Sequence, residues 1–208
     1  PVASVMYSPV YVLATPAFTG KTFADVLAQS KAKAGAIRVA TSGIATLGHI
    51  MVEQIKAKSG LELIHVPYKG GGQVVTDAAG GQFELFTTNP SPAANGQMQK
   101  GTLRVLAVGA PQRLPSFANV PTLAELGFPE ANLTSTFGVF APAKVPAEVI
   151  ARLHVEIAKA IATPDMTERL VKLDNVPAVM GPADFTKFIR NESALNAKVV
   201  RERGIKAD

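Results

Sequence analysis

Hydrophobic residues in this chain occur in two patterns: short continuous runs, and longer stretches in which they recur every three or four residues. The first pattern is typical of buried strands and the second of one face of a helix. Strands are therefore predicted at residues 10–15, 36–41, 61–66, 83–87, 103–108 and 135–141.

The predicted helices lie between these strands and after them. Thr22 and Asp25 have the spacing of a capping box, and Thr46 is predicted to cap a helix that ends at Gly60. The remaining helices are predicted at residues 72–79, 92–100 and 122–127, and from Pro146, Pro164 and Pro182 onward.

The regular alternation of strands and helices predicts an α/β fold with layered sheet and helices. The continuous apolar run at 103–108 favours a parallel sheet. Because few strands accompany the C-terminal helices, we expect most of the sheet that they cover to belong to an N-terminal portion outside this sequence. The last helix has five apolar residues on the face expected to point inward: Phe185, Phe188, Ile189, Leu195 and Val199.

Composition narrows the classes of function. The 208 residues are 47% hydrophobic and 18% charged, with a formal net charge of +5, which fits a globular protein that attracts small anions. Aromatic residues make up 6% and Trp is absent, so stacking surfaces are scarce and no nucleic-acid partner is expected. The absence of Cys excludes thiol catalysis, Cys-ligated zinc and disulfides, and is compatible with an oxidising compartment.

The chain opens at Pro1 without an initiator Met. No stretch has the pattern of a signal peptide or reaches the roughly 18 apolar residues of a membrane span. We therefore expect a processed or shortened form of a longer protein.

Three predicted strands are followed by loops that offer hydrogen-bond donors. In open α/β sheets ligands bind outside the carboxyl ends of strands, where helix N-termini add partial positive charge. The first loop carries Thr41, Ser42, Gly43 and Thr46, and His49 follows one turn into the next helix, where it faces the loop. Ordinary helix capping by Thr46 is the alternative explanation.

The second loop is a Tyr-Lys-Gly-Gly-Gly segment, and its candidate residues are Tyr68, Gly70 and Gly71. Backbone N–H groups of consecutive glycines can come close to a bound anion. A tight turn that requires positive φ is the alternative explanation for the glycines.

The third loop offers Thr87, Thr88 and Asn89, whose neutral donors can hold a carboxylate or a bridging water. A polar turn that ends at Pro90 is the alternative explanation. Together the three loops predict an anion-binding site at one edge of the sheet.

No pattern for chemistry accompanies these loops. The segment Gly20-Lys21-Thr22 resembles the end of a nucleotide-binding loop, but Thr15 stands where that motif requires Gly. No G-x-S-x-G segment occurs, and paired carboxylates near the glycines are missing. We therefore expect a binding protein with no catalytic residues and no cofactor.

The histidines do not predict a metal site. His49 and Glu53 have the spacing of half a site, but His65 and His154 lie far away in sequence. A hydrogen-bonding role is expected for His49, a satisfied core position for His65 and a helix-surface position for His154. Asp77 is expected to be a surface or structural residue.

In their order along the chain, these segments resemble the substrate-binding receptors of tripartite tricarboxylate transporters, also called Bug-family extracytoplasmic solute receptors. The resemblance extends over nearly the whole chain. It is carried by residues 43–49 (GIATLGH), 65–71 (HVPYKGG), 76–82, 101–108 (GTLRVLAV), 120–128 (VPTLAELGF) and 140–143.

The resemblance implies a periplasmic-binding-protein-like, type II-like architecture of two α/β domains joined by crossing strands, with the ligand in the cleft. It assigns residues 1–15 to part of the first domain and a crossing strand, 16–133 to a complete second domain, and 134–208 to the returning strand and the C-terminal helices of the first. Family members begin with a strand and a glycine-rich segment that this sequence lacks. One domain is therefore expected to be partial and the ligand site to be a half-site.

The resemblance also implies a periplasmic receptor that captures a small carboxylate and delivers it to the permease subunits of a tripartite tricarboxylate-type transporter. Thr87 and Thr88 stand where the family often has an acidic residue, which favours an anionic or neutral ligand over an amine-bearing one. A module that reports a bound solute to a membrane sensor, and an α/β enzyme, remain as alternatives.

Overall fold

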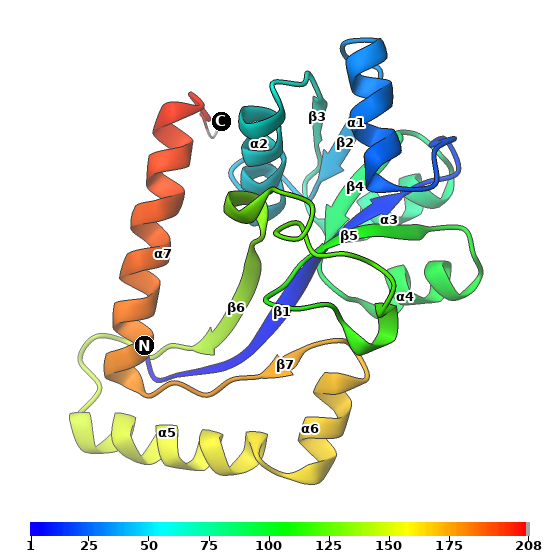
Figure 1. Ribbon diagram of the computed structural model, residues 1–208. Coiled ribbons are helices and arrows are strands. Elements are labelled where there is room, and N and C mark those ends of the chain that lie inside the picture. The colour runs from blue at the N-terminus through cyan, green and yellow to red at the C-terminus, as the bar shows by residue number, and fades with distance from the viewer. Residues whose placement is uncertain (207–208) are drawn as a thin grey trace. The chain divides into compact units, whose positions relative to one another are not determined.

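The structure is a computed structural model that describes residues 1–206 (Figure 1). Its contacts divide the chain into two units. The smaller unit holds residues 1–8 and 135–198, and the larger unit holds residues 9–134 and those from 199 onward. Three elements contribute residues to both units: β1 (Ala3–Ala14), β6 (Thr134–Val139) and α7 (Pro182–Glu202).

The larger unit is built on strands that pair in the order β3-β2-β4-β1-β5. Strand β2 is parallel to both β3 and β4, whereas β1 is antiparallel to β4 and β5. The carboxyl ends of β2, β3 and β4 therefore lie at one edge of the sheet, as the three-loop hypothesis requires. The strands that join β1 are β2 (Arg38–Thr41), β3 (Ile64–Pro67), β4 (Leu85–Thr88) and β5 (Arg104–Gly109).

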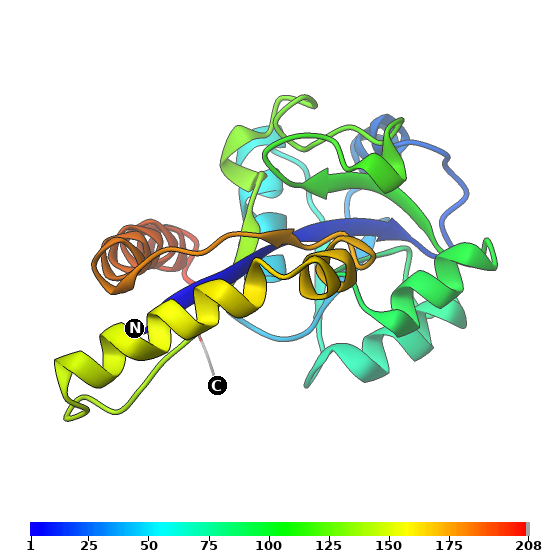
Figure 2. The ribbon, with the colours of Figure 1, turned by 90° about the horizontal axis from the view of Figure 1, so that it is seen from below.

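Helices cover both faces of this sheet (Figure 2). Along β1, Val10 and Val12 point into the core under one pair of helices, while Tyr11 and Leu13 point into the core under the other pair. Burial on both faces explains the continuous apolar runs of the central strands. The first pair is α1 (Phe23–Ala32) and α2 (Leu47–Ser59), and the second is α3 (Gly71–Ala79) and α4 (Pro92–Gln99).

Local sequence signals fixed several element ends correctly. The capping box at Thr22 and Asp25 is present, with both of its hydrogen bonds. Helix α2 ends at Gly60, which adopts the left-handed conformation with φ 68°. Helices α3 and α4 lie within a residue of their predicted bounds.

Three expectations about strands were wrong. The strand predicted at 10–15 is longer and begins at Ala3. The run at 61–66 was expected to be a buried strand, but β3 starts at Ile64 and forms the edge of the sheet, where the Ile64 side chain is 44% exposed. The run at 103–108 favoured a parallel strand, but β5 is antiparallel to β1. An apolar run reports burial on both faces, and it does not report the direction of the neighbouring strand.

The helix predicted at 122–127 was also wrong, because the chain forms only a turn there. Thr122 and Glu125 still make the two hydrogen bonds of a capping box, at 2.7 and 3.2 Å. The turn closes because the Phe128 N–H donates to the Leu123 carbonyl at 2.8 Å and both side chains are buried. Short 3-10 helices flank it at Pro115–Phe117 and Pro129–Ala131.

The smaller unit contains the first half of β1, which pairs with β6 and with the short β7 (Val176–Pro177). Its helices are α5 (Ala147–Ile161), α6 (Pro164–Val171) and most of α7. Their starts agree with the predicted positions to within one residue. No helix within residues 1–206 combines the length and apolarity that a membrane span requires.

The apolar faces of these helices are less buried than expected. Phe185 of α7 is only 2% exposed and packs against Gly138. Leu195, which was expected to point inward, is 61% exposed, and Leu153 of α5 is 41% exposed. His154, expected on the helix surface, is half-buried beside Gly181. Helical periodicity identifies an apolar face but does not determine how much of it is covered.

Candidate functional site

The loops that follow β2 and β3 are bonded to each other through their backbones. The Tyr68 N–H donates to the Thr41 carbonyl at 3.0 Å, and the Gly70 N–H donates to the Ser42 carbonyl at 3.0 Å. A Cβ at Gly43 would make a tight contact of 3.2 Å with the Tyr68 carbonyl oxygen, and its φ of 152° is rarely adopted by residues with a side chain, so glycine suits this close approach. The two loops therefore form one continuous backbone surface at the carboxyl ends of the strands.

Helix α2 begins at this surface without a side-chain cap. Thr46 occupies the N-cap position, but its hydroxyl donates to the Gly43 carbonyl at 2.8 Å and caps no helical N–H. The expectation that Thr46 caps α2 was therefore right about position and wrong about the bond. The first N–H groups of the helix keep their partial positive charge without a side-chain acceptor.

Helix α3 begins beside it in a similar state. Its N-cap is Gly70, at φ 118°, which has no side chain and therefore cannot cap. A Cβ added at Gly70, Gly71 or Gly72 would meet nothing within 4 Å, so open space adjoins this turn. Two uncapped helix N-termini thus lie on neighbouring loops, an arrangement that favours an anion.

The Tyr68 side chain anchors the second loop through a hydrogen bond and a ring contact. Its hydroxyl donates to Asp77 Oδ2 at 2.8 Å, and its ring packs edge-on against Phe83 with the centroids 5.8 Å apart. Burial raises the pKa of the Tyr68 hydroxyl, and the bond to the Asp77 carboxylate raises it further. Asp77 is structural, as expected, and the Tyr68 hydroxyl is already engaged.

The third loop is more closed than the other two. Thr87 is 3% exposed and packs against Gly48 of α2, and its hydroxyl has no hydrogen-bond partner within residues 1–206. The Thr88 hydroxyl donates to the Asn89 carbonyl at 3.2 Å. The Asn89 amide donates to the Pro9 carbonyl at 2.9 Å. These side chains tie β4 to its surroundings.

Two histidines lie beneath the first loop. His49 Nδ1 accepts from the Ala45 N–H at 3.1 Å, which confirms the expected hydrogen-bonding role. His65 Nε2 lies 2.7 Å from the Thr41 hydroxyl, so this histidine is satisfied, as expected, but it is half-buried and does not occupy the expected core position. Burial lowers the pKa of both rings, that of His65 to about 4. Across residues 1–206, no group of three or more His, Asp or Glu side chains is placed to hold a metal ion.

The structure therefore brings together the predicted residues of the first two loops. His49 contacts the first loop through its bond with the Ala45 N–H. In the third loop, Thr87 is buried, and Thr88 and Asn89 are bonded to backbone carbonyls. Sequence reasoning missed two residues. Ala45 adopts a left-handed conformation with φ 58°, for which the sequence carries no signal. Gly48 permits the close contact with Thr87, and its position in the first turn of α2 was a signal that could have been used.

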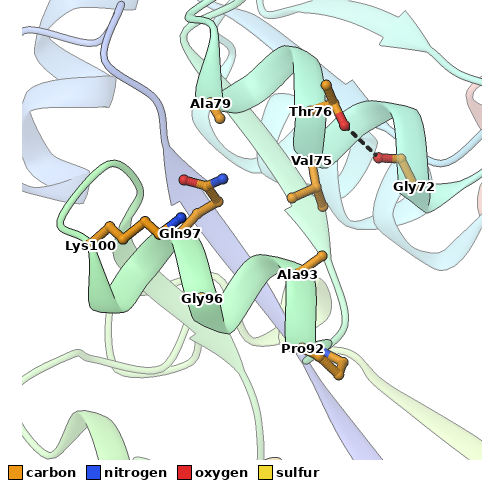
Figure 3. Close-up of a pocket in the computed structure, with 9 residues that line it drawn as sticks. All are labelled: Gly72, Val75, Thr76, Ala79, Pro92, Ala93, Gly96, Gln97 and Lys100. Carbon is orange, nitrogen blue, oxygen red and sulfur yellow. Dashed lines mark hydrogen bonds between the residues drawn. The ribbon is translucent and has the colours of Figure 1, made fainter.

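A groove of about 390 Å³ lies between α3 and α4 (Figure 3). Val75 and Ala93 face each other across it, and Gln97 and Lys100 line one end. It shares only Gly72 with the glycine segment. No carboxylate or histidine is among the nine residues that line it.

Comparison with known proteins identifies the family. Residues 1–205 match the family described as "Tripartite tricarboxylate transporter family receptor", and the chain belongs to that family. It is 31% identical over 206 residues to Protein BugT of Bordetella pertussis (strain Tohama I). That similarity covers 99% of this chain and 63% of BugT, so the chain spans less than two thirds of the length of this curated relative.

Solved structures agree with this family. One described as a periplasmic transporter superimposes with a TM-score of 0.91 at 33% identity, covering 100% of this chain and 69% of the other. An R. palustris protein solved with adipate gives a TM-score of 0.90 at 28% identity, covering 99% of this chain and 68% of the other. The predicted family and the periplasmic-binding-protein-like α/β fold class are confirmed.

Proposed function

We propose that this protein is a periplasmic receptor that captures a small carboxylate and delivers it, without turnover, to the membrane subunits of a tripartite tricarboxylate-type transporter. The observation that carries the proposal is the pair of uncapped helix starts at α2 and α3, on loops bonded to each other. Backbone N–H groups at such starts bind carboxylates through charge-assisted hydrogen bonds.

The proposed seat consists of the backbone of residues 42–48 and 70–72. Thr41, Gly43 and Thr46 shape the first loop through their mutual hydrogen bonds, and Ser42 exposes its side chain beside them. The R. palustris relative solved with adipate supports a dicarboxylate as the ligand class. Thr87, Thr88 and Asn89 would hold β4 in place and contact the ligand only through water.

Calorimetric titration with linear dicarboxylates, tricarboxylates, aromatic acids and amino acids tests the ligand class. Adipate is the first probe, and its diamide is the matched neutral control. We expect the diacid to bind and the diamide to be silent, since the helix starts attract charge. Binding of the diamide as tight as that of the diacid would overturn the carboxylate assignment.

A pair of variants tests the seat itself. Gly71→Pro removes one N–H at the first helical position, where proline is tolerated, and Gly71→Ala keeps that N–H while adding a methyl group to open space. The proline variant should bind adipate roughly tenfold more weakly than the alanine variant, the value of one hydrogen bond to a charged group. Equal affinities would place the carboxylate elsewhere.

The partner is tested separately from the ligand. Cross-linking to membranes that contain the transporter subunits should increase when adipate is present, because delivery requires recognition of the loaded receptor. Ligand-dependent capture of a sensor protein in place of a permease would instead support the signalling alternative.

A further inference from the structure

The two histidines beneath the first loop form a stacked pair. His49 of α2 and His65 of β3 have ring centroids 3.7 Å apart and ring planes inclined by 16°. His49 is 7% exposed, so little water reaches this contact. Two imidazolium rings at this separation would repel each other strongly in a poorly hydrated place.

Each ring also holds part of the loop. Because His49 Nδ1 accepts the Ala45 N–H, it carries no proton, and the neutral ring keeps its proton on Nε2. This bond secures Ala45 in its left-handed conformation. A proton added to Nδ1 would place two donors face to face and break the bond.

His65 acts through a hydroxyl. The Thr41 oxygen lies 2.7 Å from His65 Nε2 and donates to the Gly43 carbonyl at 3.0 Å. A hydroxyl has one proton, so both contacts form only when His65 Nε2–H donates. The chain from His65 through Thr41 thus fixes Gly43, whose carbonyl also accepts from Thr46.

The charged groups around the pair do not favour an imidazolium. Glu53 Oε1 lies 3.9 Å from His49 Nε2, but Lys56 at 2.6 Å and Arg203 at 3.2 Å already balance this carboxylate. Glu53 and Lys56 belong to α2 itself, and Arg203 follows α7. From β2, the Thr41 hydroxyl contacts His65.

We propose that the neutral His49–His65 pair positions the loop of residues 41–46 for carboxylate capture, and that protonation of His49 at Nδ1 releases the loop and with it the ligand. The proposal rests on the proposed function and assigns its regulation. Both histidines are positioning residues, since they act on the seat through Ala45 and Thr41.

The sign of the pH effect separates this role from simple attraction. An imidazolium near the seat would attract an anion and tighten binding in acid. If protonation of His49 releases the loop, binding weakens instead as the pH falls below the ordinary histidine value of 6.5, because burial lowers the pKa of His49.

The test uses two variants with a matched control. His49→Asn keeps an acceptor near the Nδ1 position but does not titrate, and His154→Asn makes the same exchange on α5. Between about pH 7.5 and pH 4.5, a window that extends well below the ordinary histidine value because burial lowers the pKa of His49, the Kd for adipate should rise roughly threefold more in the wild type and in His154→Asn than in His49→Asn. The ligand's own protonation cancels in this ratio. Equal ratios, or tighter wild-type binding in acid, would overturn the proposal.

A measurement without ligand keeps the outcomes distinct. In NMR spectra of the full chain, we expect His49 Nδ1 to be unprotonated and the amide signals of Gly43, Ala45 and Thr46 to titrate with the imidazole midpoint. This titration should vanish in His49→Asn and persist in His65→Gln, which keeps the His49 ring and its bond to Ala45. If adipate fails to bind at neutral pH, the ligand assignment fails while the amide titration still decides the positioning role. If these amide signals do not titrate with the imidazole midpoint, the positioning role is wrong.

Discussion

Helices α1 and α2 both begin at a threonine that follows a strand, yet they begin in opposite ways. At α1, the Thr22 hydroxyl accepts from the Asp25 N–H, and Asp25 Oδ2 accepts from the Thr22 N–H at 2.8 Å. At α2, the Thr46 hydroxyl turns back to Gly43 and caps no N–H of the helix. The N-terminus of α1 therefore has a side-chain cap, whereas Thr46 gives the N-terminus of α2 none.

The third helical residue accounts for the difference. Asp25 reaches back to its own N-cap and completes the box, whereas His49 reaches one residue further, to Ala45. The N-termini of α1 and α2 also lie at opposite ends of the strands, because β1 is antiparallel to β4. Because Thr46 does not cap the N-terminus of α2, contacts further along the helix must hold it in place.

The largest effect is expected at Glu53, which anchors α2 from within. Its side chain is 8% exposed and pairs with Lys56 and Arg203. Glu53→Gln should lower the free energy of unfolding by about 3 kcal/mol near neutral pH, since the buried side chain loses its charge-assisted hydrogen bonds with Lys56 and Arg203. The control Glu156→Gln breaks an exposed pair with Lys159 and should cost under about 0.5 kcal/mol. Urea denaturation measures both, and equal losses would contradict the anchoring role.

The Glu53 effect should depend on pH. Burial alone would raise the pKa of Glu53, but the hydrogen bonds and charges of Lys56 and Arg203 lower it overall. A lowered carboxyl pKa contributes stability above the unfolded value of 4.5, and this stability is lost as the pH falls through the folded value. The difference in the free energy of unfolding between wild type and Glu53→Gln should therefore become smaller as the pH falls below 4.5. If this difference stays constant in acid, Glu53 is not ionised in the folded protein.

A smaller effect is expected at Gly48, where α2 touches β4. An added Cβ would overlap the Thr87 hydroxyl oxygen and lie 3.1 Å from Thr87 Cβ. Gly48→Ala should destabilise the protein by about 2 kcal/mol through overpacking and also weaken adipate binding. Gly96→Ala in α4, where nothing lies within 4 Å, should instead stabilise by about 0.5 kcal/mol. The two midpoints in urea should move in opposite directions.

The two threonines test the comparison directly. Thr22→Ala removes a working cap and should cost about 1 kcal/mol of stability. Thr46→Ala removes no cap and should cost less, while weakening adipate binding because the Gly43 carbonyl loses a donor. Thermal unfolding and calorimetry on both variants give the result. A larger stability loss at Thr46 than at Thr22 would reverse the assignment.

The smallest effect is expected at Ala45, whose φ of 58° is unfavourable for any residue with a Cβ. Ala45→Gly should stabilise the protein by about 0.5 kcal/mol. The same change at Ala160, on the exposed side of α5, should destabilise by about 1 kcal/mol. If Ala45→Gly also destabilises by that amount, the left-handed conformation is not a strained one.

Local chemistry in the sequence determined the helix starts at Thr22, Pro164 and Pro182, the helix end at Gly60, and the family through its ordered motifs. These features depend on neighbours within a few residues, and such neighbours are visible in the sequence. The candidate loops were also visible, because glycines and hydroxyls cluster after strands.

Only the tertiary structure decided the order of the strands, the edge position of β3 and the antiparallel β5, because pairing joins segments that are distant in the chain. It also decided that Thr46 leaves α2 open, since that outcome depends on where the Gly43 carbonyl and the His49 ring come to lie. The stacking of His65 on His49 joins a strand to a helix across 16 residues of chain, a contact that no local pattern encodes. Sequence spacing shows which short-range hydrogen bonds are possible, whereas the packing around a site decides which of them form, as at Thr46 and His49.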